Sequence, residues 1–287
     1  MNLVLRAALC ALLLALLLPA CAIAEHFDTS IPSRGIQIPA TIALPDTHGG
    51  RFPVVIFAHG HNGSRDENRG FTAIADALTD LGIASIRIDF AGCGANTESF
   101  LNNCLTTMKA DLCAAAAYAQ TGLRATSIGL FGYSMGGRVV LEALAEGLHA
   151  DAAVLLAPAA DTQDLISSAF KDFSAMHDAA KADGFYLFRA DSSHPESLSA
   201  AWFDDLMRYP DPARSAAEAY DGPALVIYAQ DDALVSPAVS EHVIRMLHAD
   251  SADASGKGHG YGFFLETDPI REGIAQHTAD FFLNHLP

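Results

Sequence analysis

The residues 132–136 form the pattern Gly-x-Ser-x-Gly, with Ser134 at its centre. An apolar stretch, 128–131, precedes this pattern, and a stretch typical of a helix follows it. A nucleophilic serine requires this order of strand, sharp turn and helix, because the flanking glycines remove side chains that would collide where strand and helix meet. The alternative is a serine that caps a helix at an ordinary turn. The apolar stretch before the motif and the helical pattern after it favour a nucleophilic serine over a helix cap.

A nucleophilic serine needs a base and an acid that orients the base, and with this serine motif they follow in the order Ser, Asp or Glu, His. Asp231 and Asp232 come directly after a predicted strand, 224–228, at the strand end where open α/β sheets place their sites. His259 lies in a glycine-rich stretch before the last predicted helix. Other histidines near the C-terminus lie on helical patterns and are expected to be surface or core residues: His242, His248, His277 and His285. We therefore expect His259 to take the Ser134 proton while an aspartate holds the imidazole.

The tetrahedral intermediate of such a reaction also needs backbone N–H donors directed at its oxyanion. Met135, the residue after the serine, is placed to supply one donor. The turn after the predicted strand 53–58 reads His-Gly-His-Asn-Gly, and its glycines allow the backbone to approach a ligand closely. The alternative for His59 and His61 is a metal pair, but no further ligands follow at the spacing of a metal site. We expect an oxyanion hole and no metal or organic cofactor.

The elements that position these residues alternate between short apolar runs and amphipathic stretches, which is typical of a mainly parallel sheet with helices on both faces. The runs at 54–57 and 154–156 are continuously apolar, as expected for strands covered on both faces. The predicted strands are 37–44, 53–58, 84–89, 127–131, 152–156 and 224–228. The predicted helices are 68–81, 106–121, 135–148, 237–247 and 269–284. Together they predict an α/β fold.

The residues 161–220 interrupt this alternation, because the segment is too long for a simple crossover. It is rich in aromatic side chains, and we expect a helical insertion that covers the edge of the sheet. Its aromatic residues favour a small core of their own over ligand contacts. A lid over the site is the functional interpretation of the same segment.

The first 24 residues have the layout of a secretory signal peptide: a single cation, an apolar stretch at 7–18, and small residues before a cleavage point after Ala24. A membrane anchor would need about 20 apolar residues, and Pro19 interrupts the run. Lipidation at Cys21 is a third option, because the preceding residues resemble a bacterial lipobox. We predict an exported protein, periplasmic or extracellular, whose residues 25–287 form one domain. Stable membrane insertion is expected only if Cys21 is lipidated.

Three cysteines remain after the leader, namely Cys93, Cys104 and Cys113. An odd number allows at most one disulfide within the chain. In an oxidising compartment a bridge between Cys93 and Cys104 is plausible, because the intervening residues are typical of a loop. A bridge between Cys104 and Cys113 competes with it, and buried free thiols are the third option.

The chain carries 34 acidic against 17 basic side chains, a formal net charge of −17. This charge argues against binding to nucleic acid, because the phosphate backbone requires a basic surface, and it disfavours anionic membranes for the same reason. A hydrophobic content of 51% excludes a disordered chain. The charge also gives no attraction to acidic substrates.

From about residue 37 to its C-terminus the sequence resembles serine α/β-hydrolases, and more narrowly bacterial feruloyl/cinnamoyl esterase-like hydrolases with an inserted cap. Six segments carry the resemblance: HGHNG at 59–63, RIDFAGCG at 87–94, GYSMG at 132–136, LLAPA at 155–159, DALV at 232–235 and GHG at 258–260. The resemblance implies an α/β-hydrolase fold with a helical cap at about 161–220. It also implies that the triad acid is Asp232 rather than Asp231, and that the oxyanion donors are the backbone N–H groups of His61 and Met135.

The resemblance further implies a serine hydrolase that cleaves carboxylic esters of short-chain or aryl, hydroxycinnamoyl-like type. Ser134 would form an acyl-enzyme, and water activated by His259 would hydrolyse it. The expected partner is a neutral small-molecule ester. Peptidases and acyltransferases share these motifs and remain alternatives, as does a non-catalytic binding protein of the same fold.

Overall fold

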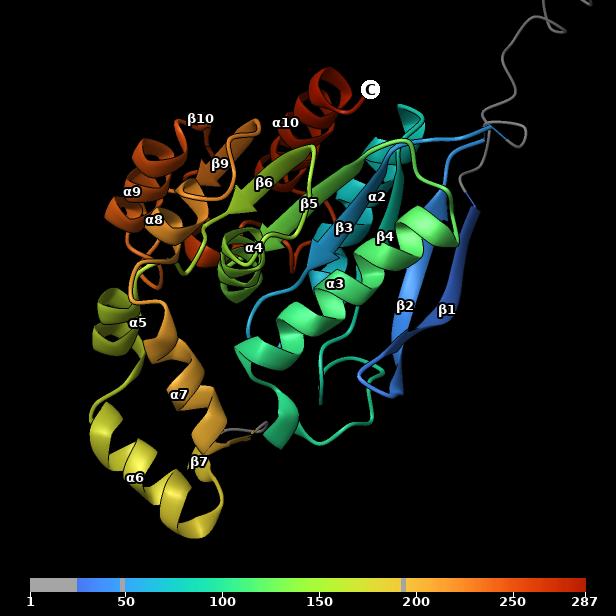
Figure 1. Cartoon of the computed structure of the whole chain (residues 1–287). Coiled ribbons are helices and arrows are strands. Elements are labelled where there is room, and N and C mark those ends of the chain that lie inside the picture. The colour runs from blue at the N-terminus through green and yellow to red at the C-terminus, as the bar shows by residue number, and fades with distance from the viewer. Residues whose placement is uncertain (1–24, 47–49, 192–194) are drawn as a thin grey trace, which may run out of the picture.

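The computed structural model describes residues 25–46, 50–191 and 195–287, and the predicted leader lies outside these ranges. Its centre is an eight-stranded sheet with the strand order β1-β2-β4-β3-β5-β6-β9-β10 (Figure 1). The strands of this sheet are β1 (Glu25–Ser33), β2 (Ile36–Leu44), β3 (Val54–Ala58), β4 (Ala84–Ile88), β5 (Ile128–Tyr133), β6 (Ala152–Leu156), β9 (Ala224–Tyr228) and β10 (Asp250–Asp253). The sheet confirms the predicted fold class.

The six strands from β4 to β10 in this order run parallel, and β2 and β1 extend one edge in antiparallel pairing. Every residue of β3, β4, β5 and β6 is buried. Burial on both faces explains why β3 and β6 are continuously apolar in the sequence, whereas β4 includes the buried polar residues Ser85 and Arg87.

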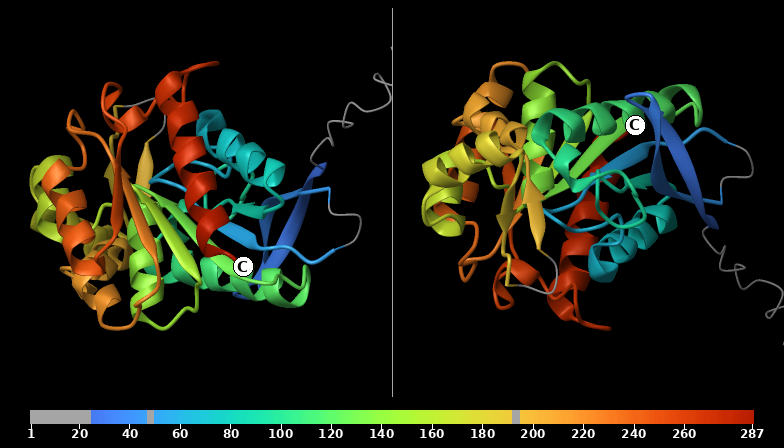
Figure 2. Two further views of the ribbon diagram at one scale, coloured as in Figure 1. Left: turned by 90° about the horizontal axis from the view of Figure 1, so that it is seen from above. Right: turned by 90° about the horizontal axis from the view of Figure 1, so that it is seen from below.

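Helices cover both faces of the sheet (Figure 2). On one face α2 (Gly70–Asp80) packs against α10 (Pro269–His285), and on the other α3 (Leu105–Thr121) packs against α4 (Met135–Ala145). A further helix, α9 (Pro237–Leu247), contacts β9. None of the helices among the described residues combines the length and apolarity needed to cross a membrane.

The residues between β6 and β9 form an insertion at the end of the sheet toward which the parallel strands point (Figure 1). The insertion comprises α5 (Thr162–Ala169), α6 (Phe173–Asp183), β7 (Tyr186–Phe188), β8 (Glu196–Leu198), α7 (Ala200–Arg208) and α8 (Pro212–Ala217). Besides the expected helices, the insertion contains β7 and β8, which pair as a small antiparallel sheet. Each of these strands has three residues, too few to show a period of two in the sequence.

The insertion has aromatic packing of its own and a buried polar anchor to the main domain. Phe170 lies between Phe173 and Trp202, with ring centroids 5.7 and 5.4 Å away. The Asp205 carboxylate, 5% exposed, accepts hydrogen bonds from the backbone N–H and the hydroxyl of Thr106 at the start of α3. The insertion is therefore held against the main domain by more than its two chain connections.

The three cysteines of the described residues are all free thiols, so neither of the disulfides considered from the sequence is present. Cys93 and Cys104 are buried, as the third option expected, whereas Cys113 is exposed. Burial raises the pKa of the Cys93 thiol to about 12, which leaves it protonated and unreactive at neutral pH.

Candidate active site

Ser134 lies at the sharp turn between β5 and α4, with φ 53° and ψ −117°. Positive φ is unusual for a residue with a side chain and marks a strained turn. The glycines beside it are needed for packing: a Cβ atom on Gly136 would lie 1.9 Å from the carbonyl oxygen of Ala58, and one on Gly132 would lie 2.6 Å from that of Gly136. The turn therefore presents the serine hydroxyl at the end of the sheet.

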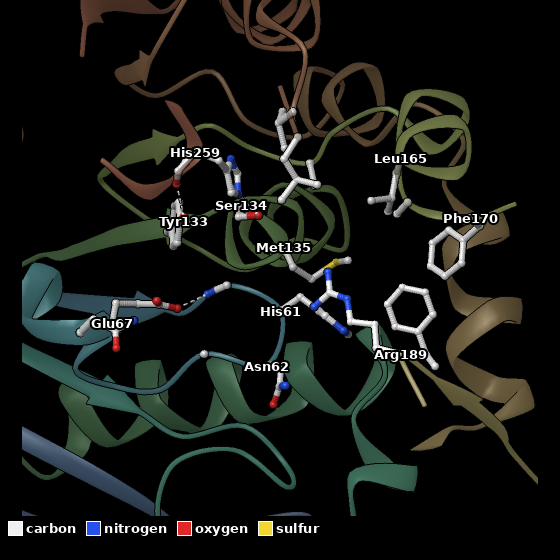
Figure 3. Close-up of a pocket in the computed structure, with 18 of the residues that line it drawn as sticks. His61, Asn62, Glu67, Tyr133, Ser134, Met135, Leu165, Phe170, Arg189 and His259 are labelled. Carbon is white, nitrogen blue, oxygen red and sulfur yellow. Dashed lines mark hydrogen bonds between the residues drawn. The ribbon is translucent and has the colours of Figure 1, made fainter. Parts of the chain in front are cut away.

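His259 lies beside Ser134 (Figure 3) and links the serine to a carboxylate. Its Nε2 lies 2.9 Å from Ser134 Oγ, and its Nδ1 lies 2.7 Å from Asp232 Oδ2. Because a carboxylate only accepts hydrogen bonds, Nδ1 carries the proton and Nε2 is free to accept the serine proton. The structure thus brings together the three side chains expected from the sequence, from the turns after β5 and β9 and from the loop after β10.

The Asp232 side chain is 1% exposed, and its carboxylate accepts further hydrogen bonds besides that from His259. Oδ1 accepts the backbone N–H groups of Leu234 and Val235, and Oδ2 accepts the Tyr261 hydroxyl at 3.1 Å. Burial alone would raise the pKa of Asp232, but the hydrogen bonds from His259 and from the two N–H groups lower it below its ordinary value. Asp232 is therefore ionised at neutral pH and can stabilise an imidazolium.

The neighbouring Asp231 has a different contact. Its two carboxylate oxygens accept the backbone N–H groups of Gly256 and Gly258, at 2.8 and 3.0 Å. These bonds, that from Gly256 most of all, lower the pKa of Asp231. Asp231 thus holds the loop that carries His259, whereas Asp232 holds the imidazole ring.

Tyr133 supports His259 from below. The two rings stack with centroids 5.2 Å apart and an angle of 29° between their planes, and the Tyr133 hydroxyl donates to the backbone carbonyl of His259 at 2.5 Å (Figure 3). The sequence analysis missed this contact, because Tyr133 occupies a variable position of the serine motif. Nothing in the local sequence shows that residues 126 positions apart will stack.

The two expected oxyanion donors lie beside Ser134 and line the same pocket. Met135 is the first residue of α4, where backbone N–H groups have no partner within the helix. His61 lies in a tight turn closed by a hydrogen bond from the Gly63 N–H to the Gly60 carbonyl at 3.1 Å. Both residues therefore line the pocket in front of Ser134, as an oxyanion hole would require.

His59 has a structural position that the metal-pair alternative does not fit. Its Nδ1 donates to the Gly60 carbonyl at 2.7 Å, and its Nε2 accepts the Phe90 N–H at 3.0 Å. Complete burial lowers the pKa of His59 to about 4, so the ring is neutral. Both ring nitrogens are thus engaged, and within the described residues no group of three or more His, Cys, Asp or Glu side chains is arranged to hold a metal ion.

Glu67 is a further site residue that the sequence did not reveal. It is 5% exposed, lines the pocket, and accepts the Gly60 N–H through Oε1 at 2.7 Å (Figure 3). Burial raises the pKa of Glu67 to about 7, although the hydrogen bond from Gly60 opposes this shift. The backbone at this point is strained, since residues 67–69 all have positive φ.

The pocket in front of Ser134 has a volume of about 260 Å³ and mixes residues of the main domain with residues of the insertion (Figure 3). The insertion contributes mostly apolar side chains, namely Leu165, Ala169, Phe170, Phe188 and Trp202. Apart from histidines, the charged side chains in its lining are Glu67 and Arg189. The aromatic residues of the insertion thus serve both its own core and the pocket.

One family model matches most of this chain. The family model described as "Serine aminopeptidase, S33" matches residues 51–257. No match was found among curated protein sequences.

Solved structures with a similar fold come from several organisms. Est1E from Butyrivibrio proteoclasticus with ferulic acid bound is 21% identical, with a TM-score of 0.71 over 90% of this chain and 98% of that chain. The esterase domain of a Rhodothermus marinus protein is 18% identical, with a TM-score of 0.68 over 92% of this chain and 100% of that chain. The acylaminoacyl peptidase of Pyrococcus horikoshii is 16% identical, with a TM-score of 0.66 over 95% of this chain and 43% of that chain. At these identities the likeness establishes the fold.

Proposed function

The chain belongs to the serine aminopeptidase S33 family of α/β-hydrolases, and we propose that this serine hydrolase cleaves small carboxylic esters through an acyl-enzyme on Ser134. The observation that carries the proposal is the hydrogen-bonded chain from Asp232 through His259 to Ser134 beside a small, largely apolar pocket. The strained serine turn and the adjacent backbone donors support it. Esterases among the structures of similar fold agree with this reaction.

In the proposed reaction the Ser134 hydroxyl attacks the ester carbonyl while His259 Nε2 removes its proton. The resulting imidazolium lies against the ionised Asp232, and the negative oxygen of the tetrahedral intermediate accepts the N–H groups of His61 and Met135. Collapse of this intermediate breaks the bond to the alkoxide leaving group, which takes the proton from His259. Water then attacks the acyl-enzyme with His259 again as base, and the acid is released.

The pocket favours an acyl group that is short or aromatic. A volume of about 260 Å³ lined by Leu165, Phe170 and Trp202 suits a short chain or a single ring. Ferulic acid bound to Est1E supports aryl esters of hydroxycinnamoyl type as candidates for this chain. The proposed substrate is therefore a neutral small-molecule ester.

Peptide hydrolysis is the second candidate. The family model is described by a serine aminopeptidase, and a structure of similar fold is an acylaminoacyl peptidase. An aminopeptidase needs an acidic group for the substrate's ammonium, and the carboxyl of Glu67 lines the pocket. Aminoacyl amides therefore belong in the substrate test.

A fluorophosphonate probe tests the nucleophile. We expect the wild type to be labelled, Ser134→Ala to lose all labelling, and His259→Ala to lose most of it. Ser215→Ala on α8 is the matched control and should be labelled like the wild type. Labelling that persists in Ser134→Ala would refute the assignment.

A substrate panel then separates the reaction classes. It comprises p-nitrophenyl esters, methyl hydroxycinnamates and aminoacyl p-nitroanilides, each with and without an added alcohol as acyl acceptor. Higher kcat/KM on esters supports the esterase, and higher kcat/KM on the anilides supports the peptidase. Ester formation with the alcohol in place of hydrolysis would identify an acyltransferase.

We also propose that the protein is exported and cleaved after Ala24. The strand β1 is described over Glu25–Ser33, and these residues would remain in the mature chain. N-terminal sequencing of protein from the periplasm or medium should begin at Glu25. A lipid-modified chain beginning at Cys21 would support the lipoprotein alternative instead.

A further inference from the structure

The side chains of two buried glutamates hold the turn that carries His61. Glu67 belongs to the main domain and accepts the Gly60 N–H. Glu196 belongs to β8 of the insertion and contacts the next two residues of the turn, His61 and Asn62. The turn therefore forms hydrogen bonds with a residue of the main domain and with a residue of the insertion.

The contacts of Glu196 are short and buried. Its carboxylate, 2% exposed as a side chain, lies 2.5 Å from His61 Nε2 and accepts Asn62 Nδ2 at 2.9 Å. A weaker contact comes from Arg189 at 3.4 Å. Burial alone would raise the pKa of Glu196, but the hydrogen bond from His61 and the nearby positive charge lower it. The carboxylate is thus ionised and His61 Nε2 is the donor.

The His61 ring is also enclosed by aromatic side chains. Phe100 meets it edge-on with centroids 5.9 Å apart, and Trp202 on α7 meets it at 5.8 Å. A ring that contacts a carboxylate and two aromatic neighbours has little rotational freedom. The position of the side chain then restricts the backbone of the same residue. Fixing this side chain therefore fixes the N–H group of the same residue.

We propose that Glu196 is a positioning residue for ester hydrolysis: by holding His61 and Asn62 it orients the His61 N–H toward the oxyanion. The inference rests on the proposed function, since it concerns the oxyanion hole of that reaction. The insertion then completes the catalytic arrangement as well as lining the pocket. The pair depends on a histidine at position 61 and a glutamate 135 residues later.

The consequence is a change in kcat rather than in KM. The oxyanion exists only in the tetrahedral intermediate and its flanking transition states, so a misplaced donor weakens their binding and leaves substrate binding nearly unchanged. Complete loss of one oxyanion donor costs about 10²–10³ in rate. A displaced donor should cost less, about tenfold.

The test compares Glu196→Ala and Glu196→Gln with Asp205→Asn. Asp205 is the matched control, because it is a buried carboxylate that also joins the insertion to the main domain but contacts α3 instead of the turn. With p-nitrophenyl acetate we expect Glu196→Ala to lower kcat about tenfold with KM within about twofold. Glu196→Gln retains one acceptor oxygen and should lie between it and the wild type. Asp205→Asn should keep the wild-type kcat.

The Ki of an alkyl trifluoromethyl ketone is a measurement that a purely structural role of Glu196 would leave unchanged. The ketone forms a hemiketal on the serine whose oxyanion occupies the same position, so its Ki should rise by the factor by which kcat/KM falls. His61→Phe keeps the backbone N–H but removes the tether, and it should resemble Glu196→Ala. This variant also serves if Glu196→Ala does not fold.

The outcomes separate the two proposals. A wild type that neither hydrolyses the ester nor binds the ketone refutes the proposed function itself. An active wild type whose Glu196 and His61 variants match Asp205→Asn in kcat and in Ki refutes the positioning role alone. The positioning role would also be refuted if kcat fell equally in all variants and in proportion to their loss of thermal stability. Such losses would reflect general destabilisation.

Discussion

Replacing Glu67 by glutamine should make the protein more stable at alkaline pH. Glu67 is 5% exposed and holds the turn beside the nucleophile by accepting the Gly60 N–H at 2.7 Å. Burial disfavours its charged form and raises its pKa from about 4.5 to about 7. The folded protein therefore keeps this carboxyl neutral over a pH range in which the unfolded chain ionises it.

The sign and size of the effect follow from this difference. A group whose pKa is raised on folding contributes stability that is fully present below its unfolded pKa and is lost as pH rises through its folded pKa. Each pH unit in this interval corresponds to about 1.4 kcal/mol, so the interval from about 4.5 to about 7 corresponds to a loss on the order of 3 kcal/mol. Glutamine has the shape of the neutral acid, keeps an oxygen for the Gly60 N–H, and does not ionise.

The assay is urea unfolding of wild type and Glu67→Gln between pH 4.5 and 8.5. The free energies of unfolding should differ least at pH 4.5, and the variant should gain up to about 3 kcal/mol by pH 8. The difference between the two free energies of unfolding removes the contribution of titrating groups common to both proteins, such as His59. Glu218→Gln, at an exposed position after α8, is the control and should show no such gain. A Glu67→Gln protein whose advantage does not grow with pH, or that is less stable at pH 8, would refute the reasoning.

Three other predictions follow from the geometry of the site. Gly136→Ala should unfold the protein or cost more than about 3 kcal/mol in urea unfolding, because its Cβ would lie 1.9 Å from the Ala58 carbonyl oxygen; wild-type stability would contradict the close approach. Asp232→Asn should lower kcat by up to about 10⁴ whereas Asp231→Asn should lower it less than about tenfold, and the reverse ranking in steady-state kinetics would move the role to Asp231. Because burial lowers the pKa of His59 to about 4, this residue contributes stability above pH 6.5 that is lost as pH falls through 4. Its imidazole NMR signals should therefore not titrate between pH 5 and 8, and a titration midpoint near 6.5 would contradict its burial.

Much of the fold and the three residues of the hydrogen-bonded chain could be predicted because local chemistry dictates them. The buried strands β3, β5 and β6 must be apolar throughout, and so they are visible as continuous runs. The serine turn requires its glycines, and the reaction requires a carboxylate and a histidine at strand ends. These demands act over a few residues each, which a single sequence can reveal.

The edge strands could not be predicted in the same way. In β10 the sequence is Asp-Ser-Ala-Asp, and every residue but Ala252 is exposed, so no apolar pattern marks it. β1 is polar over most of its length and is held by pairing with β2 along its whole extent. Pairing with a neighbour determined both strands, against their composition.

The supporting residues of the site were equally hidden. Glu196 meets His61 across 135 residues, and Tyr133 meets His259 across 126. Each appears in the sequence as an ordinary polar or aromatic residue. Only the folded chain shows that a carboxylate from the insertion and another from η1 (Glu67–Arg69) converge on one turn.

The most direct test of the account is to trap the acyl-enzyme. Wild type mixed with p-nitrophenyl acetate and quenched in acid within milliseconds should carry one acetyl group, and peptide mass spectrometry should place it on Ser134. Ser134→Ala should carry none. An acetyl group on another residue, or ester turnover with no covalent intermediate in either protein, would contradict the proposed nucleophile.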